Sequence, residues 1–288
     1  MGIFANPLTD LLEYEDFSRD FLKGTDPVGM TGCIDSEKVH FMSTFLGEKK
    51  VQLVVTYNEQ RAREIEEDYK LFCSQVYVIP PRDLIFFSAD LQGNAIIAER
   101  MKAFAALYQN EAKVIITTMD ALMSAAVPFE QLMSHVIKLK EGDELDLEKL
   151  KHDLTVMGYE RVGRVEEPGQ FTVHGGIADV YPLTMEVPVR IELWGDEIDT
   201  IRCFEPQSQR SMDQIECVSV FPAAEVIADD TARRRAVGMI QNELESQLAV
   251  FKKAKEPDKA KRLREETNRI LEALGEDVVL EAPDSYIS

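Results

Sequence analysis

Residues 1–127 alternate between short apolar runs and longer amphipathic segments. The apolar runs Val51–Thr56, Val76–Ile79 and Val114–Thr118 have the length of buried strands. Between them, a charge-rich segment from Asn58 to Cys73 and apolar residues at helical spacing from Ala89 to Gln109 predict two helices. Strands that alternate with helices are typical of a parallel sheet covered on both faces. We therefore expect an α/β domain in this part of the chain.

The pattern changes at Val127-Pro128, after which turn signals separate short strands. One helix is predicted from Leu145 to Met157. The strands predicted around it are His135–Lys140, Gln170–His174, Ile177–Tyr181, Val189–Leu193, Glu197–Phe204 and Glu216–Phe221. Pro222 marks the exit from this region. We therefore expect residues 128–221 to form an α+β domain, inserted between two parts of the α/β domain, residues 1–127 and 222–288.

The last part of the chain is mainly helical. Apolar positions between Asp229 and Leu274 recur at helical spacing, and Pro257 suits the first turn of a second helix. Val278–Leu280 predicts a further strand close to the last residue. The ending is therefore expected to be that of a fragment, cut before the last strands of its sheet.

Composition and charge narrow the class of protein. Apolar residues make up 45% of the chain, as in globular proteins, and their longest runs are far shorter than a membrane span. The four cysteines are scattered, neither they nor the histidines have metal-site spacing, and the first residues do not resemble a signal peptide. These features favour the cytoplasm. The net charge of −20 opposes DNA binding, which needs a basic surface, and favours a protein partner.

The stretch Pro168–Pro182 carries the most information about function. Its pattern predicts a hairpin in which Thr172 and His174 lie on the side opposite Phe171. The simplest interpretation is a hairpin that serves the fold alone. The alternative is that its polar side, with nearby arginines, binds a partner. Gly195-Asp196 predicts another hairpin turn, beside which the only tryptophan, Trp194, is expected to be partly buried.

The same stretch resembles the signature Pro-Gly-x-Phe-x-x-Arg-Gly-x-x-Asp-(Ile/Val)-(Phe/Tyr)-Pro, which the excision-repair protein UvrB shares with the N-terminal part of the transcription-repair coupling factor. The segment from Val189 to Arg202, followed by Gln209-Arg210-Ser211, is similar to the coupling factor in particular. The resemblance spans nearly the whole chain. It implies a degenerate RecA-like domain of the P-loop NTPase type, with an inserted α+β domain that binds UvrA, the damage-sensing ATPase of nucleotide excision repair.

The resemblance also implies what lies outside this chain. RNA polymerase and DNA would bind other regions of a longer protein, and ATP and Mg²⁺ would serve a motor located there. This chain would then be an adaptor without a cofactor, and not an enzyme.

By position, the resemblance implies a UvrA-binding surface, whose residues are Arg161, Arg164, Phe171, Thr172, His174 and Asp179. Phe171 is either an aromatic anchor of this surface or a core residue. Thr172 and His174 replace arginines of UvrB, and histidine carries little positive charge near neutral pH. The surface is therefore either weaker than in UvrB or dependent on Arg161 and Arg164, whose planar guanidinium groups pair with carboxylates.

Residues Gly32–Val39 have the frame of a phosphate-binding loop, GxxxxGK[ST], with two substitutions. Glu37 puts a carboxylate where the second glycine should let backbone amides approach a phosphate, and Val39 lacks the hydroxyl that would bind magnesium. Lys38 alone does not restore the site. The connection Pro81–Ser88 is also too short for the long aromatic hairpin with which UvrB clamps damaged DNA.

Two other functions remain open from the sequence. The first is a UvrB-type ATPase that acts directly on damaged DNA, against which the substituted loop argues. The second is a structural domain that holds the rest of a longer protein in an inactive arrangement.

Overall fold

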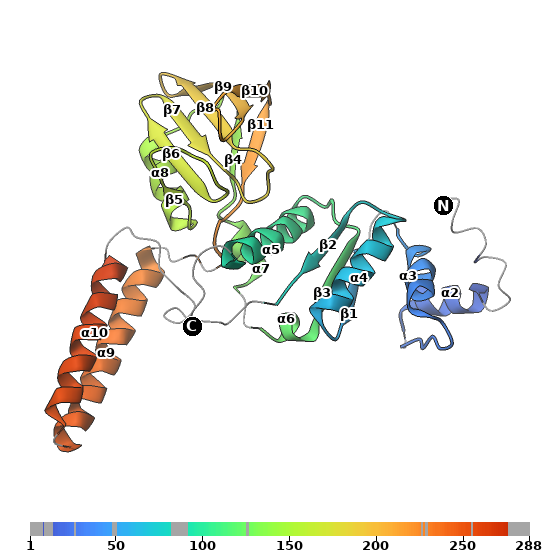
Figure 1. Ribbon diagram of the computed structural model, residues 1–288, viewed down its shortest axis with the longest axis horizontal. Helices are drawn as coiled ribbons and strands as arrows, with labels where there is room; N and C mark the ends of the chain where they lie inside the picture. Colours follow the sequence, from blue (N-terminus) through green and yellow to red (C-terminus); the bar gives the residue numbers. More distant parts are fainter. Residues whose placement is uncertain are drawn as a thin grey trace. The chain divides into compact units, whose positions relative to one another are not determined.

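The computed structural model describes residues 8, 14–25, 27–47, 51–81, 92–124, 127–225, 227, 230–254 and 256–275. The chain divides into two compact units, Met1–Ile85 with Asp90–Ala125, and Phe86–Ala89 with Ala126–Ser288 (Figure 1). Two sequence predictions fall on residues outside the described ranges: the connection Pro81–Ser88, of which only Pro81 is described, and the strand Val278–Leu280.

The first unit is built on a three-stranded parallel sheet. Its strands lie in the order β1 (Gln52–Thr56), β3 (Val114–Thr118), β2 (Val76–Ile79). Helix α4 (Glu59–Lys70) packs on one face, where Tyr69 lies in a cluster with Ile116. Helix α5 (Gln92–Tyr108) packs on the other, where Ala106 lies in a cluster with Ile115. Successive residues of β3 therefore face different helices, and the predicted parallel α/β sheet is confirmed.

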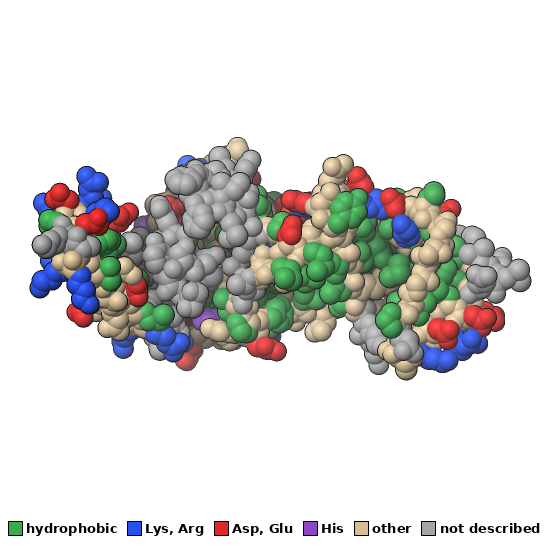
Figure 2. All heavy atoms as spheres, turned by 90° about the horizontal axis from the view of Figure 1, so that it is seen from below, with side chains coloured by type: hydrophobic (Ala, Val, Ile, Leu, Met, Phe, Trp, Pro, Cys, Tyr) green, Lys and Arg blue, Asp and Glu red, His purple; other side chains and the backbone are tan. Residues whose placement is uncertain are grey.

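One side of β1 is open, although the pattern predicts a sheet covered on both faces. Leu53 and Val55 of β1 are exposed, because the described part of α5 packs against residues of β2 and β3. Apolar side chains of the neighbouring helix α6 (Met119–Met123) are exposed as well, among them Leu122 and Met123. Figure 2 shows apolar side chains gathered on the lower side of this unit, where Figure 1 places α6.

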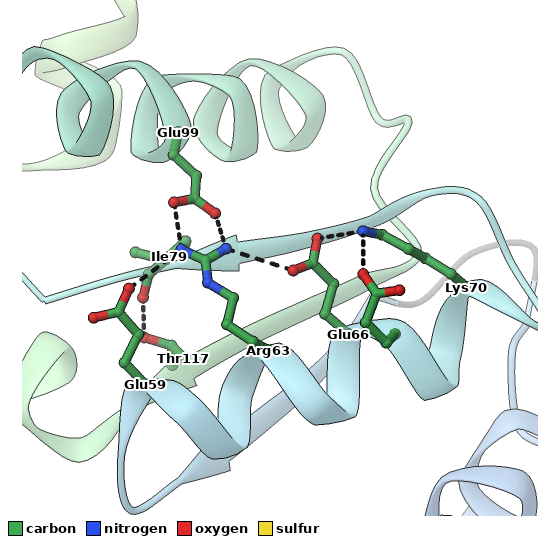
Figure 3. A network of polar contacts seen from close by, with 8 residues as sticks. Glu59, Arg63, Glu66, Lys70, Ile79, Glu99 and Thr117 are labelled. Atoms are coloured by element: carbon green, nitrogen blue, oxygen red, sulfur yellow. Dashed lines mark hydrogen bonds and ion pairs between the residues drawn. The ribbon is translucent and has the colours of Figure 1, made fainter.

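Charge pairs and aromatic rings connect the helices of the first unit. Arg63 of α4 pairs with Glu99 of α5 through both of its terminal nitrogens, with Nη2 at 2.6 Å from Oε2 (Figure 3). This carboxylate holds the pKa of Arg63 above its ordinary value. Helix α2 (Tyr14–Lys23) packs on α3 (Asp35–Ser43) through Phe17 and Phe41, whose ring centroids lie 4.8 Å apart.

The second unit contains a six-stranded sheet and a two-stranded sheet around a shared core. The six strands lie in the order β10 (Ser211–Gln214), β9 (Glu197–Phe204), β8 (Val189–Trp194), β7 (Ile177–Val180), β6 (Gln170–His174), β5 (Glu160–Arg161). All neighbours are antiparallel except β5 and β6. The two-stranded sheet pairs β4 (Ile137–Lys140) with β11 (Cys217–Val220), and α8 (Leu147–Val156) closes the core. The predicted strands and the helix are confirmed; β5, β10 and α7 (Phe129–Met133) were not predicted.

Hydrogen bonds hold the segment after α8 to the segment after β11. The Met157 carbonyl accepts from the backbone N–H groups of Ala223 and Ala224, at 2.9 and 3.1 Å. The hydroxyl of Tyr159 donates to the Phe221 carbonyl at 2.7 Å. Burial raises the pKa of Tyr159, so the hydroxyl keeps the proton that it donates.

Two helices follow the sheets. Helices α9 (Asp230–Ala254) and α10 (Pro257–Gly275) pack side by side, and Pro257 is the first residue of the second, as predicted (Figure 1). Within the described ranges of the chain, every helix is too short or too polar to span a membrane.

Candidate functional site

The six-stranded sheet has an inner face toward α8 and an outer face that carries most of the predicted site. On β6, Phe171 and Val173 point into the core with Leu150 and Leu154 of α8. The alternate residues form the outer face, which we define as Thr172, His174, Ile177, Asp179, Arg190, Glu192, Thr200 and Arg202. Strand alternation thus separates the residues that pack toward α8 from those of the outer face.

Thr172 and His174 lie next to each other on this outer face. The Thr172 hydroxyl and Nε2 of His174 are 2.9 Å apart. Thr172 itself is buried, whereas His174 is exposed at the end of β6. His174 is therefore available to a partner, and Thr172 fixes the position of its ring.

Asp179 is held in a bidentate ion pair with Arg190. Nε and Nη2 of Arg190 lie 2.8 and 2.7 Å from the two carboxylate oxygens of Asp179. The hydrogen bonds from Arg190 to Asp179 hold the pKa of the guanidinium above its ordinary value. The guanidinium also lies 4.8 Å from the ring centroid of Phe204, a cation–π distance. Asp179 is thus a partner of Arg190 within the sheet.

The two predicted arginines differ in their surroundings. Arg164 donates to the carbonyls of Pro206 and Gln207 and pairs with Glu166, so it holds a loop in place. Arg161 lies on the edge strand β5 and is exposed. Its guanidinium has no ion pair within the part of the chain that the structure describes. Of the two, Arg161 is therefore the one able to receive a carboxylate from a partner.

Phe171 does not reach the surface. It is fully buried among the residues of the inner core, beside Val189 and Ile191. Its interpretation as a surface anchor is corrected: the ring is a core residue, because it sits on the side of β6 that faces α8.

Sequence reasoning missed Arg190, Glu192 and Arg202 on the outer face. Their strands were predicted, and the alternation of Val189–Leu193 places Arg190 and Glu192 on the side opposite the apolar residues. The sequence does not give the register of the strands. That register brings four residues of neighbouring strands into one row, in the order Thr172, Asp179, Arg190, Arg202.

The predicted nucleotide loop precedes and enters α3. Gly32 has a positive φ of 84°, as a tight turn requires. The Glu37 carboxylate turns back and accepts from the Ile34 backbone N–H at 3.1 Å. It therefore occupies a donor at the helix N-terminus, the type of group that binds phosphate in a complete loop.

Lys38 and Val39 of the loop are also engaged within the domain. The Lys38 ammonium lies 3.1 Å from Asp35, which also pairs with Arg61 at 3.5 Å. Lys38 and Arg61 together hold the pKa of Asp35 below its ordinary value. Val39 is buried in the cluster that α4 forms with the sheet, together with Ala62. Lys38 is thus neutralised by its own helix, and Val39 serves the core.

Comparison with known proteins shows which proteins this chain is similar to. Residues 137–225 match the family model of the UvrB interaction domain. The chain is 33% identical over 231 residues to a transcription-repair-coupling factor of Staphylococcus haemolyticus, covering 79% of this chain and 19% of that protein. It is 29% identical over 259 residues to that of Bacillus subtilis, covering 88% of this chain and 22% of the relative. The chain therefore spans about a fifth of the length of these relatives.

Proposed function

Since this chain belongs to the transcription-repair-coupling factor family, as a module that resembles UvrB, we propose that it is a non-catalytic adaptor that binds UvrA. In this role it recruits UvrA, in nucleotide excision repair, to lesions at which RNA polymerase has stalled. In this proposal, RNA polymerase, DNA and ATP are bound by regions outside this chain.

The observation that carries this proposal is the extent of the UvrB interaction domain. The matched residues 137–225 include the whole outer face and also Arg161, which is exposed on the edge strand β5. An exposed arginine without an ion pair suits a partner that presents carboxylates. The engaged loop at Glu37 and Lys38 supports the non-catalytic part of the proposal.

Surface plasmon resonance with purified UvrA tests the docking site. Removing one arginine from a desolvated charge pair costs about 2–5 kcal/mol, because the partner carboxylate is left unpaired. At about 1.4 kcal/mol per decade, Arg161→Ala should weaken binding by about 30-fold or more. The fold should stay intact, because Arg161 is exposed. Arg164→Ala tests the second arginine, but it also removes the contacts to the Pro206–Gln207 loop.

The control is Arg234→Ala, an exposed arginine on α9, which should bind UvrA like the wild type. Wild-type affinity of the Arg161→Ala, Arg164→Ala double variant would show that UvrA binds elsewhere. A chain that binds no UvrA at all would favour the structural, autoinhibitory role instead.

A further inference from the structure

The only tryptophan of the chain projects into solvent at the end of β8. Trp194 is 84% exposed, so the expectation of partial burial is wrong. It pairs with Glu197 across the β8–β9 hairpin, and its position alternates with Leu193, which packs against the core. Burying a tryptophan side chain is strongly favourable, so an exposed one offers a large gain in binding free energy to a partner that covers it.

Trp194 belongs to the same surface as the outer face. It follows Arg190 and Glu192 at alternate positions of β8 and therefore points to the same side. Ile177 of β7, 40% exposed, is registered with Glu192 and so lies diagonally across from Trp194. The end of the outer face thus carries two exposed apolar side chains next to its polar rows.

Beyond the row that holds Ile177 and Glu192, the next row of the outer face has more cations than anions. It runs from Thr172 through Asp179 and Arg190 to Arg202. Asp179 is committed to Arg190. Nε of Arg202 is buried and has no hydrogen-bond partner, and within the described residues its guanidinium has no ion pair. Because the residue is partly exposed, its guanidinium can still be reached by a carboxylate supplied from outside the domain.

From these contacts we infer that Trp194 and Arg202 are two further anchors of the surface that binds UvrA. This rests on the proposed function and adds its central residues. Trp194 with Ile177 would fill an apolar depression of UvrA, and Arg202 would receive a UvrA carboxylate. Trp194 lies four residues beyond Arg190 on β8, roughly 13 Å at about 3.3 Å per residue, so one interface of standard size covers both anchors. Tryptophan and arginine are the residues most enriched among those that dominate binding energy.

The test measures UvrA binding by the full 288-residue chain and its variants with surface plasmon resonance. Trp194→Ala and Arg202→Gln are each expected to weaken binding by about 30-fold, the effect of about 2 kcal/mol at 1.4 kcal/mol per decade. Trp194→Ala leaves the fold intact because the side chain is exposed. Arg202→Lys keeps the charge but loses the planar fork, and should bind with intermediate affinity.

The matched controls lie away from the outer face. Tyr57→Ala removes another highly exposed aromatic side chain, on the first unit, and Arg234→Gln removes an exposed arginine on α9. Both should bind UvrA like the wild type. Wild-type affinity of Trp194→Ala and Arg202→Gln, in a chain that does bind UvrA, would overturn this inference and leave the proposed function standing. A wild-type chain that fails to bind UvrA would overturn both.

Discussion

Arginines of this chain make two kinds of ion pair, which differ in exposure. The side chains of Arg63 and Glu99 are 38% and 31% exposed, so water screens their attraction. In the pair of Arg190 with Asp179, the carboxylate side chain is only 8% exposed. Loss of the partner therefore matters more for Asp179, which would be left as a nearly buried charge.

Arg190→Met should lower the free energy of unfolding by about 3 kcal/mol, because it leaves the Asp179 carboxylate unpaired. The double variant Asp179→Asn, Arg190→Met removes that charge and should recover part of the loss. Differential scanning calorimetry of the two variants gives the comparison. A double variant less stable than Arg190→Met would show that the unpaired Asp179 carboxylate does not cause the loss in the free energy of unfolding.

Single residues also show where sequence reasoning stops. Alternation along β6 predicted correctly that Thr172 and His174 lie opposite Phe171, because a strand has a strict period of two. Alternation does not say whether anything covers the outer side. For this reason Trp194 was expected to be partly buried, although it is exposed, and the burial of Thr172 was not predicted.

At the scale of elements, the end of α8 fixes the path of the chain through the second unit. Gly158 follows the helix with a positive φ of 89°. A Cβ atom there would lie 2.6 Å from the Ala224 Cβ and 3.2 Å from the Ala224 backbone nitrogen. The close approach is the same one that lets Met157 accept from Ala223 and Ala224.

Gly158→Ala should therefore destabilise the second unit by about 2–5 kcal/mol, the sum of a left-handed backbone penalty and an overpacked contact. Thermal unfolding followed by circular dichroism measures the loss. Gly175→Ala is the matched control: its φ is 60°, but nothing lies within 4 Å of the added Cβ, so only about 1–2 kcal/mol should be lost. Equal losses in the two variants would mean that the contact with Ala224 adds nothing.

The start of α3 gives a prediction about nucleotides. Glu37 accepts from the Ile34 N–H, and Asp35 holds Lys38, so the groups that would bind phosphate are engaged within the helix. Calorimetric titration of the chain with Mg-ATP should show no binding tighter than about 1 mM, and no ATP should be hydrolysed. Micromolar binding would contradict this account of the loop and favour the UvrB-type ATPase.

Element prediction depended on the apolar pattern. Strands β2 and β3 were predicted with the bounds that the structure has, because each is a short apolar run between turns. Strands β5 and β10 were missed, since they are two and four residues long and exposed throughout. They exist because neighbouring strands offer unpaired backbone groups at the edges of the sheet, which no local sequence pattern reports.

At the scale of the whole chain, charge is the property that bears most on function. A net charge of −20 sets a long-range repulsion against any polyanion, and local arginines act only at short range. Both effects act at the outer face. Its arginines form ion pairs with carboxylates at short range, whereas the net charge of the chain favours a protein partner over a nucleic acid.

The chain should therefore fail to bind duplex DNA, with or without a lesion, in a gel-shift experiment at physiological salt. Duplex DNA carries one negative charge per about 1.7 Å, and binding requires cations that release its counterions. Lowering the ionic strength to about 0.01 M extends the Debye length to about 30 Å, so the net repulsion of the whole chain should grow and binding should still not appear. Binding that appears only at low salt would instead reveal a local basic patch strong enough to outweigh the net charge. A lesion-specific shift at physiological salt would contradict the prediction, because damage recognition would then belong to this chain itself and not to UvrA.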